Sequence, residues 1–176
     1  MATRWLFKTE PSVYSYQQLV KDKKTMWDGV ANNLALMHLK DIKKGDQIFI
    51  YHTGDERQAV GIARALGGAY SDPGKDNPRM LVVDIEPVKA LPKPVTLAEV
   101  KADKKLAKFD LVRNSRLSIM KLTEEQWDAM MVYDHLKRAW SYDLGETELE
   151  GLRVLNDLSC KYDLIRASRL TITVKA

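Results

Sequence analysis

The chain has 176 residues, of which 45% are hydrophobic and 30% charged, and its formal net charge at pH 7 is +4. This composition excludes the low hydrophobicity of a disordered chain, and the length predicts one domain with a hydrophobic core plus, at most, an appendage. A single cysteine, Cys160, excludes an internal disulfide and a thiolate-rich metal site, which fits a reducing compartment. The longest apolar runs are too short to span a bilayer, so we expect no membrane partner and a cytoplasmic location, or a nuclear one in a eukaryote.

The positive charge is concentrated in one segment. Residues 101–121 carry seven basic and two acidic side chains, a local net charge of +5, so the rest of the chain nets −1 because the total is +4. Such a patch attracts phosphates, although a basic helix face is also common as plain solvated surface. The candidate phosphate contacts in this segment are Lys101, Lys104, Lys105 and Lys108.

Short strands and helices are predicted along the first part of the chain. Residues 3–8 have the aromatic and β-branched content of a strand, and Ser15 with Gln18 forms a capping box that opens a helix through residue 20. Residues 25–33 have no clean period, which predicts an ordered loop before a helix over residues 34–42. The β-type runs 47–53 and 58–66 are separated by a four-residue turn and predict a hairpin.

The second part of the chain predicts more helices and a separate extension. A loop is expected over residues 67–78, followed by a strand over 80–88 that Pro92 and Pro94 close. Capping boxes at Thr96 with Glu99 and at Thr123 with Gln126 each predict a helix, with a strand over 116–121 between them. We expect one domain over residues 1–131 and a carboxy-terminal extension over 132–176, with a helix and an extra strand at 170–174.

A repeat connects the basic segment with the extension. Residues 108–119 and 161–172 are identical at eight of twelve positions. The second copy is either a duplication of the segment that leads into a strand or a second basic contact surface. Two copies alone do not make a solenoid. Because a β-rich tail invites strand pairing, the extension could also join two copies of the chain into a homo-oligomer.

Sequence motifs of enzymes are scarce. The chain has no phosphate-loop, dinucleotide or nucleophile-elbow motif, and the three histidines His38, His52 and His135 show no metal-ligand spacing, so we expect no metal and no cofactor. Asp84 followed by the Glu-x-Lys pattern at Glu99 is similar to the carboxylate and lysine arrangement of metal-dependent nucleases. Glu99 is also the third position of a capping box, which favours a structural role for its carboxylate.

Aromatic and polar residues in three stretches suit a nucleobase pocket. A site that binds one extruded base needs flat aromatic faces, donors and acceptors for the base edge, and cations for phosphate. Trp27 lies in the expected irregular loop, Asn32 follows it, and Tyr51, His52 and Thr53 end a predicted strand. Packing in the core is the alternative for each, because a lone tryptophan is commonly a core residue.

A series of spaced motifs over residues 3–131 resembles the EVE domain family, which includes the thymocyte nuclear protein group. The motifs include Trp5-Leu6-Phe7-Lys8-Thr9-Glu10-Pro11, Tyr14-Ser15, Trp27-Asp28-Gly29-Val30, Gly45-Asp46, Tyr51-His52 and Leu111-Val112-Arg113. The resemblance implies an α+β fold, namely a PUA-like mixed β-barrel with flanking helices. It also implies non-catalytic recognition of a modified nucleobase, notably modified cytosine, with DNA or RNA as the partner.

The resemblance further implies roles for individual residues. Trp27 would be the stacking platform and Tyr51 a second wall of the pocket. Edge contacts would come from Asn32, His52 and Thr53, and the cations at the pocket mouth would be Lys8 and Arg116. Two positions depart from the family pattern, since Ala31 replaces a usual arginine and Thr53 a usual serine. A nuclease-like enzyme and a protein-interaction module remain as alternative functions.

Overall fold

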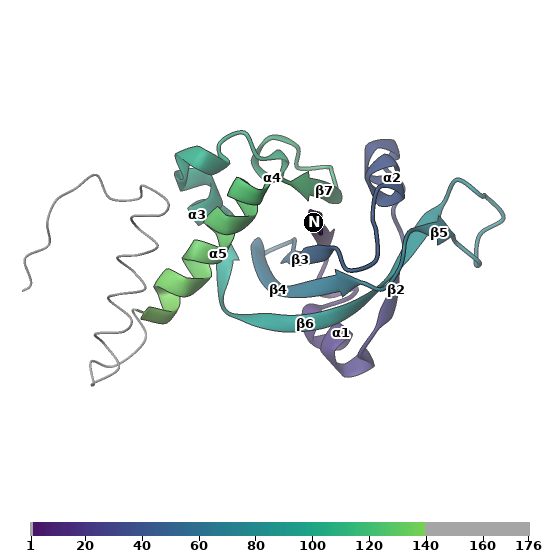
Figure 1. Cartoon of the computed structure of the whole chain (residues 1–176), viewed down its shortest axis with the longest axis horizontal. Helices are drawn as coiled ribbons and strands as arrows, with labels where there is room; N and C mark the ends of the chain where they lie inside the picture. The colour runs from purple at the N-terminus through teal and green to yellow at the C-terminus, as the bar shows by residue number, and fades with distance from the viewer. Residues whose placement is uncertain (1, 140–176) are drawn as a thin grey trace, which may run out of the picture. The chain divides into compact units, whose positions relative to one another are not determined.

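The computed structural model describes residues 2–139 (Figure 1). The chain divides into two units, Met1–Asp134 and His135–Ala176, and the sheet and the pocket belong to the first. The helix and strand predicted for the extension, and the second copy of the repeat at 161–172, lie outside the described residues. None of the described helices is both long and apolar enough to cross a membrane.

One curled sheet of mixed strands forms the frame of the first unit. Its order is β2 (Thr25–Trp27), β6 (Leu81–Thr96), β4 (Gln58–Ala65), β3 (Gln47–His52), β1 (Arg4–Thr9) and β7 (Ile119–Leu122), while β5 (Tyr70–Ser71) pairs with β6. All neighbours run antiparallel except β1 and β3, which are parallel. Figure 1 shows that the strands curl into a half-barrel with helices around it, as the sequence resemblance implies.

Three of the flanking helices begin where the sequence predicts caps, at Ser15, Thr96 and Thr123. The flanking helices are α1 (Tyr16–Asp22), α2 (Asn33–Lys40), α3 (Leu97–Ala102), the short 3₁₀ turn η1 (Lys104–Leu106), α4 (Asp110–Arg113) and α5 (Glu124–Ala139). Ser15 accepts a hydrogen bond from the Gln18 amide at the start of α1. A reciprocal capping box of Thr96 and Glu99 opens α3, and Thr123 and Gln126 exchange equivalent bonds at the start of α5.

The structure differs from the sequence prediction in the second half of the sheet. Residues 25–27 form β2 rather than a loop, because their backbone pairs with residues 83–85 of β6. Strand β6 does not end before its prolines but continues past Pro92 and Pro94 to Thr96. Pro92 and Pro94 fall between Ala90 and Val95, where a register shift interrupts the pairing of β6 with β4, so neither ring removes a ladder hydrogen bond.

Aromatic side chains fill the core between the sheet and the helices. Helix α5 is attached through Trp127, whose ring centroid lies 4.0 Å from that of Phe49, and the Arg4 guanidinium lies 4.8 Å from the Trp127 ring centroid. Helix α1 packs on β4 through Tyr16, whose hydroxyl donates to the Ile62 carbonyl at 3.1 Å. A Cβ on Gly61 would lie within 2.6 Å of the Tyr16 ring, so this close approach requires glycine.

A buried carboxylate connects the amino terminus to the turn before β3. Asp46 is 3% exposed and accepts three hydrogen bonds, from the Thr3 amide (2.8 Å), the Trp5 indole Nε1 (2.9 Å) and the Lys43 amide (3.1 Å). Charge-assisted bonds of this kind compensate for the desolvation of a buried carboxylate. Asp46 therefore fixes the start of β1, the strand whose other end reaches the candidate site.

Candidate functional site

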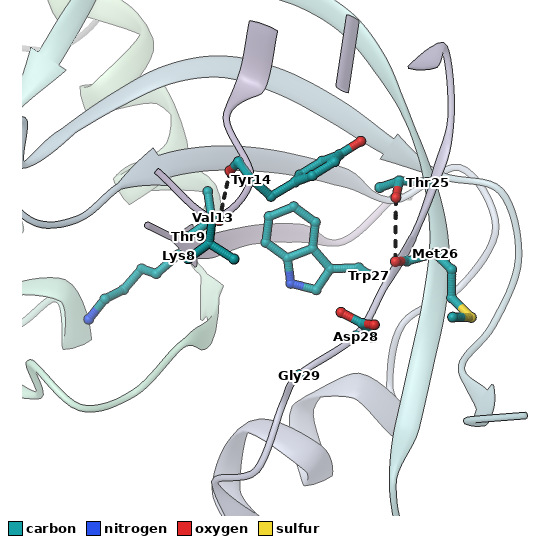
Figure 2. Close-up of a pocket in the computed structure, with 9 residues that line it drawn as sticks. All are labelled: Lys8, Thr9, Val13, Tyr14, Thr25, Met26, Trp27, Asp28 and Gly29. Carbon is teal, nitrogen blue, oxygen red and sulfur yellow. Dashed lines mark hydrogen bonds between the residues drawn. The ribbon is translucent and has the colours of Figure 1, made fainter. Parts of the chain in front are cut away.

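A pocket of about 420 Å³ lies between the end of β1 and the strand β2 (Figure 2). Three strands separate β1 from β2 in the sheet order, so the curl of the half-barrel brings these segments together. The volume is within the range of roughly 300–1,000 Å³ that small-ligand pockets occupy. The residues that line it are Lys8, Thr9, Val13, Tyr14, Thr25, Met26, Trp27, Asp28 and Gly29.

Trp27 is at once a core residue and a wall of the pocket. It is 8% exposed, and its ring centroid lies 5.4 Å from that of Phe7 and 6.4 Å from that of Tyr14. Its backbone is held in register opposite Val83 of β6. Figure 2 shows the indole at the centre of the lining residues, with Tyr14 on one side and Asp28 on the other. From the sequence, packing in the core and lining a pocket are alternatives for Trp27. In the structure Trp27 does both.

Tyr14 is fixed by hydrogen bonds at both its ends. Its hydroxyl donates to an Asp22 carboxylate oxygen at 2.9 Å, and its carbonyl accepts from the Thr9 hydroxyl at 2.8 Å. Burial is the main cause that raises the pKa of the Tyr14 phenol above its usual value of 10.0, with the Asp22 carboxylate acting in the same direction. The phenol is therefore neutral at pH 7 and presents an uncharged aromatic wall that stands edge-on to Trp27.

Charges of both signs lie at the pocket. The Lys8 ammonium donates to the Ser115 carbonyl at 2.6 Å, and burial lowers the pKa of Lys8 below 10.5. This bond ties Ser115, the residue before the exposed Arg116, to a side chain that lines the pocket. The exposed Asp28 supplies a carboxylate, which accepts hydrogen bonds only.

Of the seven residues that the sequence proposes as ligand contacts, only Lys8 and Trp27 line the pocket. Tyr51 is buried, and this burial raises its pKa to about 12, while Arg57 acts in the opposite direction. Asn32 caps α2, where its Oδ1 accepts from the amides of Leu34 and Ala35. Asn32 therefore caps α2, a role typical of asparagine before a helix, and is not among the residues that line this pocket.

His52 and Thr53 do not line the pocket, but their side chains bond to residues close to its lining in the sequence. His52 is 1% exposed, and its Nε2 accepts from the Tyr16 amide at 3.0 Å while its Nδ1 lies 2.7 Å from a Glu56 carboxylate oxygen. The Thr53 hydroxyl donates to a Glu10 carboxylate oxygen at 2.8 Å. Thr53 therefore connects the end of β3 to the segment between β1 and α1, which contributes Val13 and Tyr14 to the pocket, and His52 connects β3 to the first residue of α1.

The basic patch predicted from the sequence is exposed but does not line the pocket. Lys101 lies on α3, Lys104 and Lys105 on η1, and Lys108 just after them, all on the surface. Figure 1 shows α3 and β2 at opposite ends of the half-barrel. The far end of this basic segment is connected to a pocket residue, because the carbonyls of Ser115 and Ser118 accept from the ammonium and the amide of Lys8.

The nuclease-like pattern is divided between two structural roles. Glu99 Oε2 accepts from the Thr96 amide at 2.8 Å and from the Thr96 hydroxyl at 2.7 Å, which confirms the capping box. Asp84, on β6, accepts from the Tyr70 hydroxyl at 2.9 Å. Over residues 2–139, no cluster of three or more histidine, cysteine, aspartate or glutamate side chains has the arrangement of a metal site.

The sequence did not identify most of the pocket lining. Tyr14 and Asp28 stand inside the motifs that carry the family resemblance, and this position was the signal that could have indicated them. Thr25 and Met26 had no such signal. Their place depends on the pairing of β2 with β6, whose partners are about 60 residues apart in the chain.

Comparisons with known proteins agree with this architecture. The EVE domain family matches residues 3–133. Human thymocyte nuclear protein 1 is 27% identical, over 74% of this chain and 73% of its own length. A Rhodopseudomonas palustris protein solved by NMR has a TM-score of 0.73 and 39% identity, and the match covers 77% of this chain and 94% of that one.

A second solved structure comes from the thymocyte nuclear protein group. It is human THYN1 protein in complex with 5-methylcytosine-containing DNA, with a TM-score of 0.69 and 28% identity over 76% of this chain and 98% of that chain. These matches confirm the PUA-like fold class that the motifs imply. On the family match and the shared half-barrel, this chain belongs to the EVE domain family.

Proposed function

We propose that this protein is a non-catalytic reader of a modified nucleobase, such as a modified cytosine, in DNA or RNA. The observation that carries the proposal is the aromatic pocket in which Trp27 and Tyr14 stand nearly perpendicular, at 88°. Trp27 would stack on the extruded base and Tyr14 would close one side, while Asp28 would accept a hydrogen bond from an amino group on the base edge. The similarity to a protein solved with 5-methylcytosine-containing DNA supports this ligand class.

The hydroxyl groups of the pocket support binding rather than catalysis. A hydroxyl becomes a nucleophile when an adjacent base accepts its proton. The Thr9 hydroxyl instead donates to the Tyr14 carbonyl at 2.8 Å, and the Thr25 hydroxyl bonds to the Tyr14 phenol. Both hydroxyls are therefore bonded to Tyr14, an arrangement that holds the walls of the pocket in place.

A binding screen tests the proposed function. Matched DNA and RNA oligonucleotides would carry cytosine, 5-methylcytosine, 5-hydroxymethylcytosine, adenine or N6-methyladenine at one central position. The proposal expects tighter binding to at least one modified base than to its unmodified partner, at equal salt concentration. Equal affinity for every modified and plain pair would contradict a reader function.

The basic patch is proposed to contact phosphates that lie away from the extruded base. Charge reversal at Lys104 and Lys105 should weaken binding to all sequences alike. It should also reduce the slope of log affinity against log salt by about one to two, because fewer counterions are released on binding when phosphate contacts are lost. Fluorescence anisotropy over a salt series measures both effects. Unchanged affinity and slope would show that these lysines are solvated surface only.

A further inference from the structure

Val13 is an exposed apolar side chain at the mouth of the pocket. At 82% exposure it is the most exposed of the large hydrophobic side chains among the described residues. Single exposed apolar residues are common and need no function by themselves. Val13 differs from the others because it lines the pocket, on the same side of Trp27 as Lys8 in Figure 2.

The turn that presents Val13 is held firmly from both sides. The amides of Val13 and Tyr14 both donate to the Glu10 carbonyl at 2.9 Å. The carboxylate of Glu10 accepts from the Thr53 hydroxyl at 2.8 Å, and the Thr53 amide donates to the Thr9 carbonyl at 2.8 Å. These bonds fix the backbone on either side of Val13, so its β-branched side chain projects from a rigid support.

We infer that Val13 is a wedge that enters a DNA duplex at the place vacated by the base that the pocket receives. The inference rests on the proposed function. Extruding a base breaks its pairing and stacking, and an apolar side chain inserted between base steps compensates part of that loss. The side chain that fills the gap must stand beside the pocket, be apolar and be solvent-exposed before binding, and Val13 meets all three conditions.

Lys8 is the cation beside the wedge, and we expect the backbone of the extruded nucleotide to pass next to it. Lys8 lines the same pocket, and its ammonium bonds to the carbonyl of Ser115, the residue before Arg116. A flipped nucleotide carries its two flanking phosphates out of the regular helix, so cations next to the wedge would hold the distorted strand. A wedge also blocks the return of the base, which predicts that Val13 acts mainly on the dissociation rate.

The test compares a duplex with a single strand. The probes are a DNA duplex with one central 5-methylcytosine, its 5-methylcytosine strand alone, and the same duplex and strand with cytosine at that position. The proteins are the wild type, Val13→Ala and Val88→Ala. Val88 is 48% exposed on β6 and does not line the pocket, so it is a matched control. Because the two lost methyl groups would otherwise be buried in the stack, we expect Val13→Ala to bind the duplex about tenfold more weakly. Its single-strand affinity and its melting temperature should be unchanged, and Val88→Ala should behave as the wild type on every probe.

The outcomes separate the wedge from the reader function. Unchanged duplex affinity in Val13→Ala would overturn the wedge and leave the reader function standing. An equal loss on duplex and single strand would make Val13 a wall of the pocket and would also overturn the wedge. A wild-type protein that does not distinguish 5-methylcytosine from cytosine in either the duplex or the single strand would overturn both the reader function for this base and the wedge that depends on it.

Discussion

Replacing Trp27 by alanine is expected to lower the free energy of unfolding by about 3–5 kcal/mol, the usual cost of removing a buried tryptophan. The ring packs against Phe7 and Tyr14 and is 8% exposed, so its loss opens a cavity between β1 and β2. In the fraction that stays folded, affinity for a modified-base oligonucleotide should also fall, by about 1–3 kcal/mol for one lost base–aromatic stack. Urea unfolding and oligonucleotide titration at low temperature measure the two losses.

Trp127→Ala is the matched control for this variant. Trp127 is equally a buried tryptophan in contact with an aromatic ring, Phe49, but it does not line the pocket. It should lose a similar amount of stability and keep the oligonucleotide affinity of its folded fraction. A Trp27→Phe variant retains part of the packing, and full wild-type affinity in that folded variant would argue that Trp27 is not the stacking platform.

Replacing Asp46 by alanine is expected to destabilise the fold by about 3 kcal/mol, because one buried and two partly buried donors lose their charged acceptor together. These donors are the Thr3 and Lys43 amides and the Trp5 indole. Asp46→Asn keeps the shape and one acceptor oxygen, so it should cost less. Chemical unfolding of both variants measures the difference.

Asp55 offers a control for the loss of Asp46, because it is an exposed aspartate in the turn after β3. Its replacement by alanine should change the unfolding free energy by less than about 0.5 kcal/mol, as is usual for exposed positions. If Asp46→Ala unfolded at the same urea concentration as Asp55→Ala, the three-donor network would not stabilise the amino terminus.

The elements that the sequence predicts well are those defined by local signals. The strand over residues 47–53, its hairpin partner over 58–66, and the caps at Ser15, Thr96 and Thr123 all depend on neighbours within a few residues. The fold class was also predictable, because many spaced motifs of one family occur in order. A set of motifs fixes the topology even where single elements are ambiguous.

The elements that the sequence predicts poorly depend on distant partners. Residues 25–27 form a strand because β6 passes beside them, and β6 tolerates Pro92 and Pro94 because its pairing with β4 is interrupted at these residues. The same limit applies to the site. His52 and Asn32 are polar residues in motif regions, yet their atoms bond to the Tyr16 amide and to the first turn of α2, which residue type alone does not reveal.

The most direct test of the reader function follows the tryptophan indole signals of ¹⁵N-labelled protein during titration with a DNA oligonucleotide that contains 5-methylcytosine. Trp27 lines the pocket, whereas the Trp5 indole is bonded to buried Asp46 and Trp127 packs on Phe49, so these two serve as internal references. The account predicts that the Trp27 signal shifts, more with 5-methylcytosine than with cytosine, while the signals of Trp5 and Trp127 stay in place. Binding that leaves the Trp27 signal unmoved would contradict it.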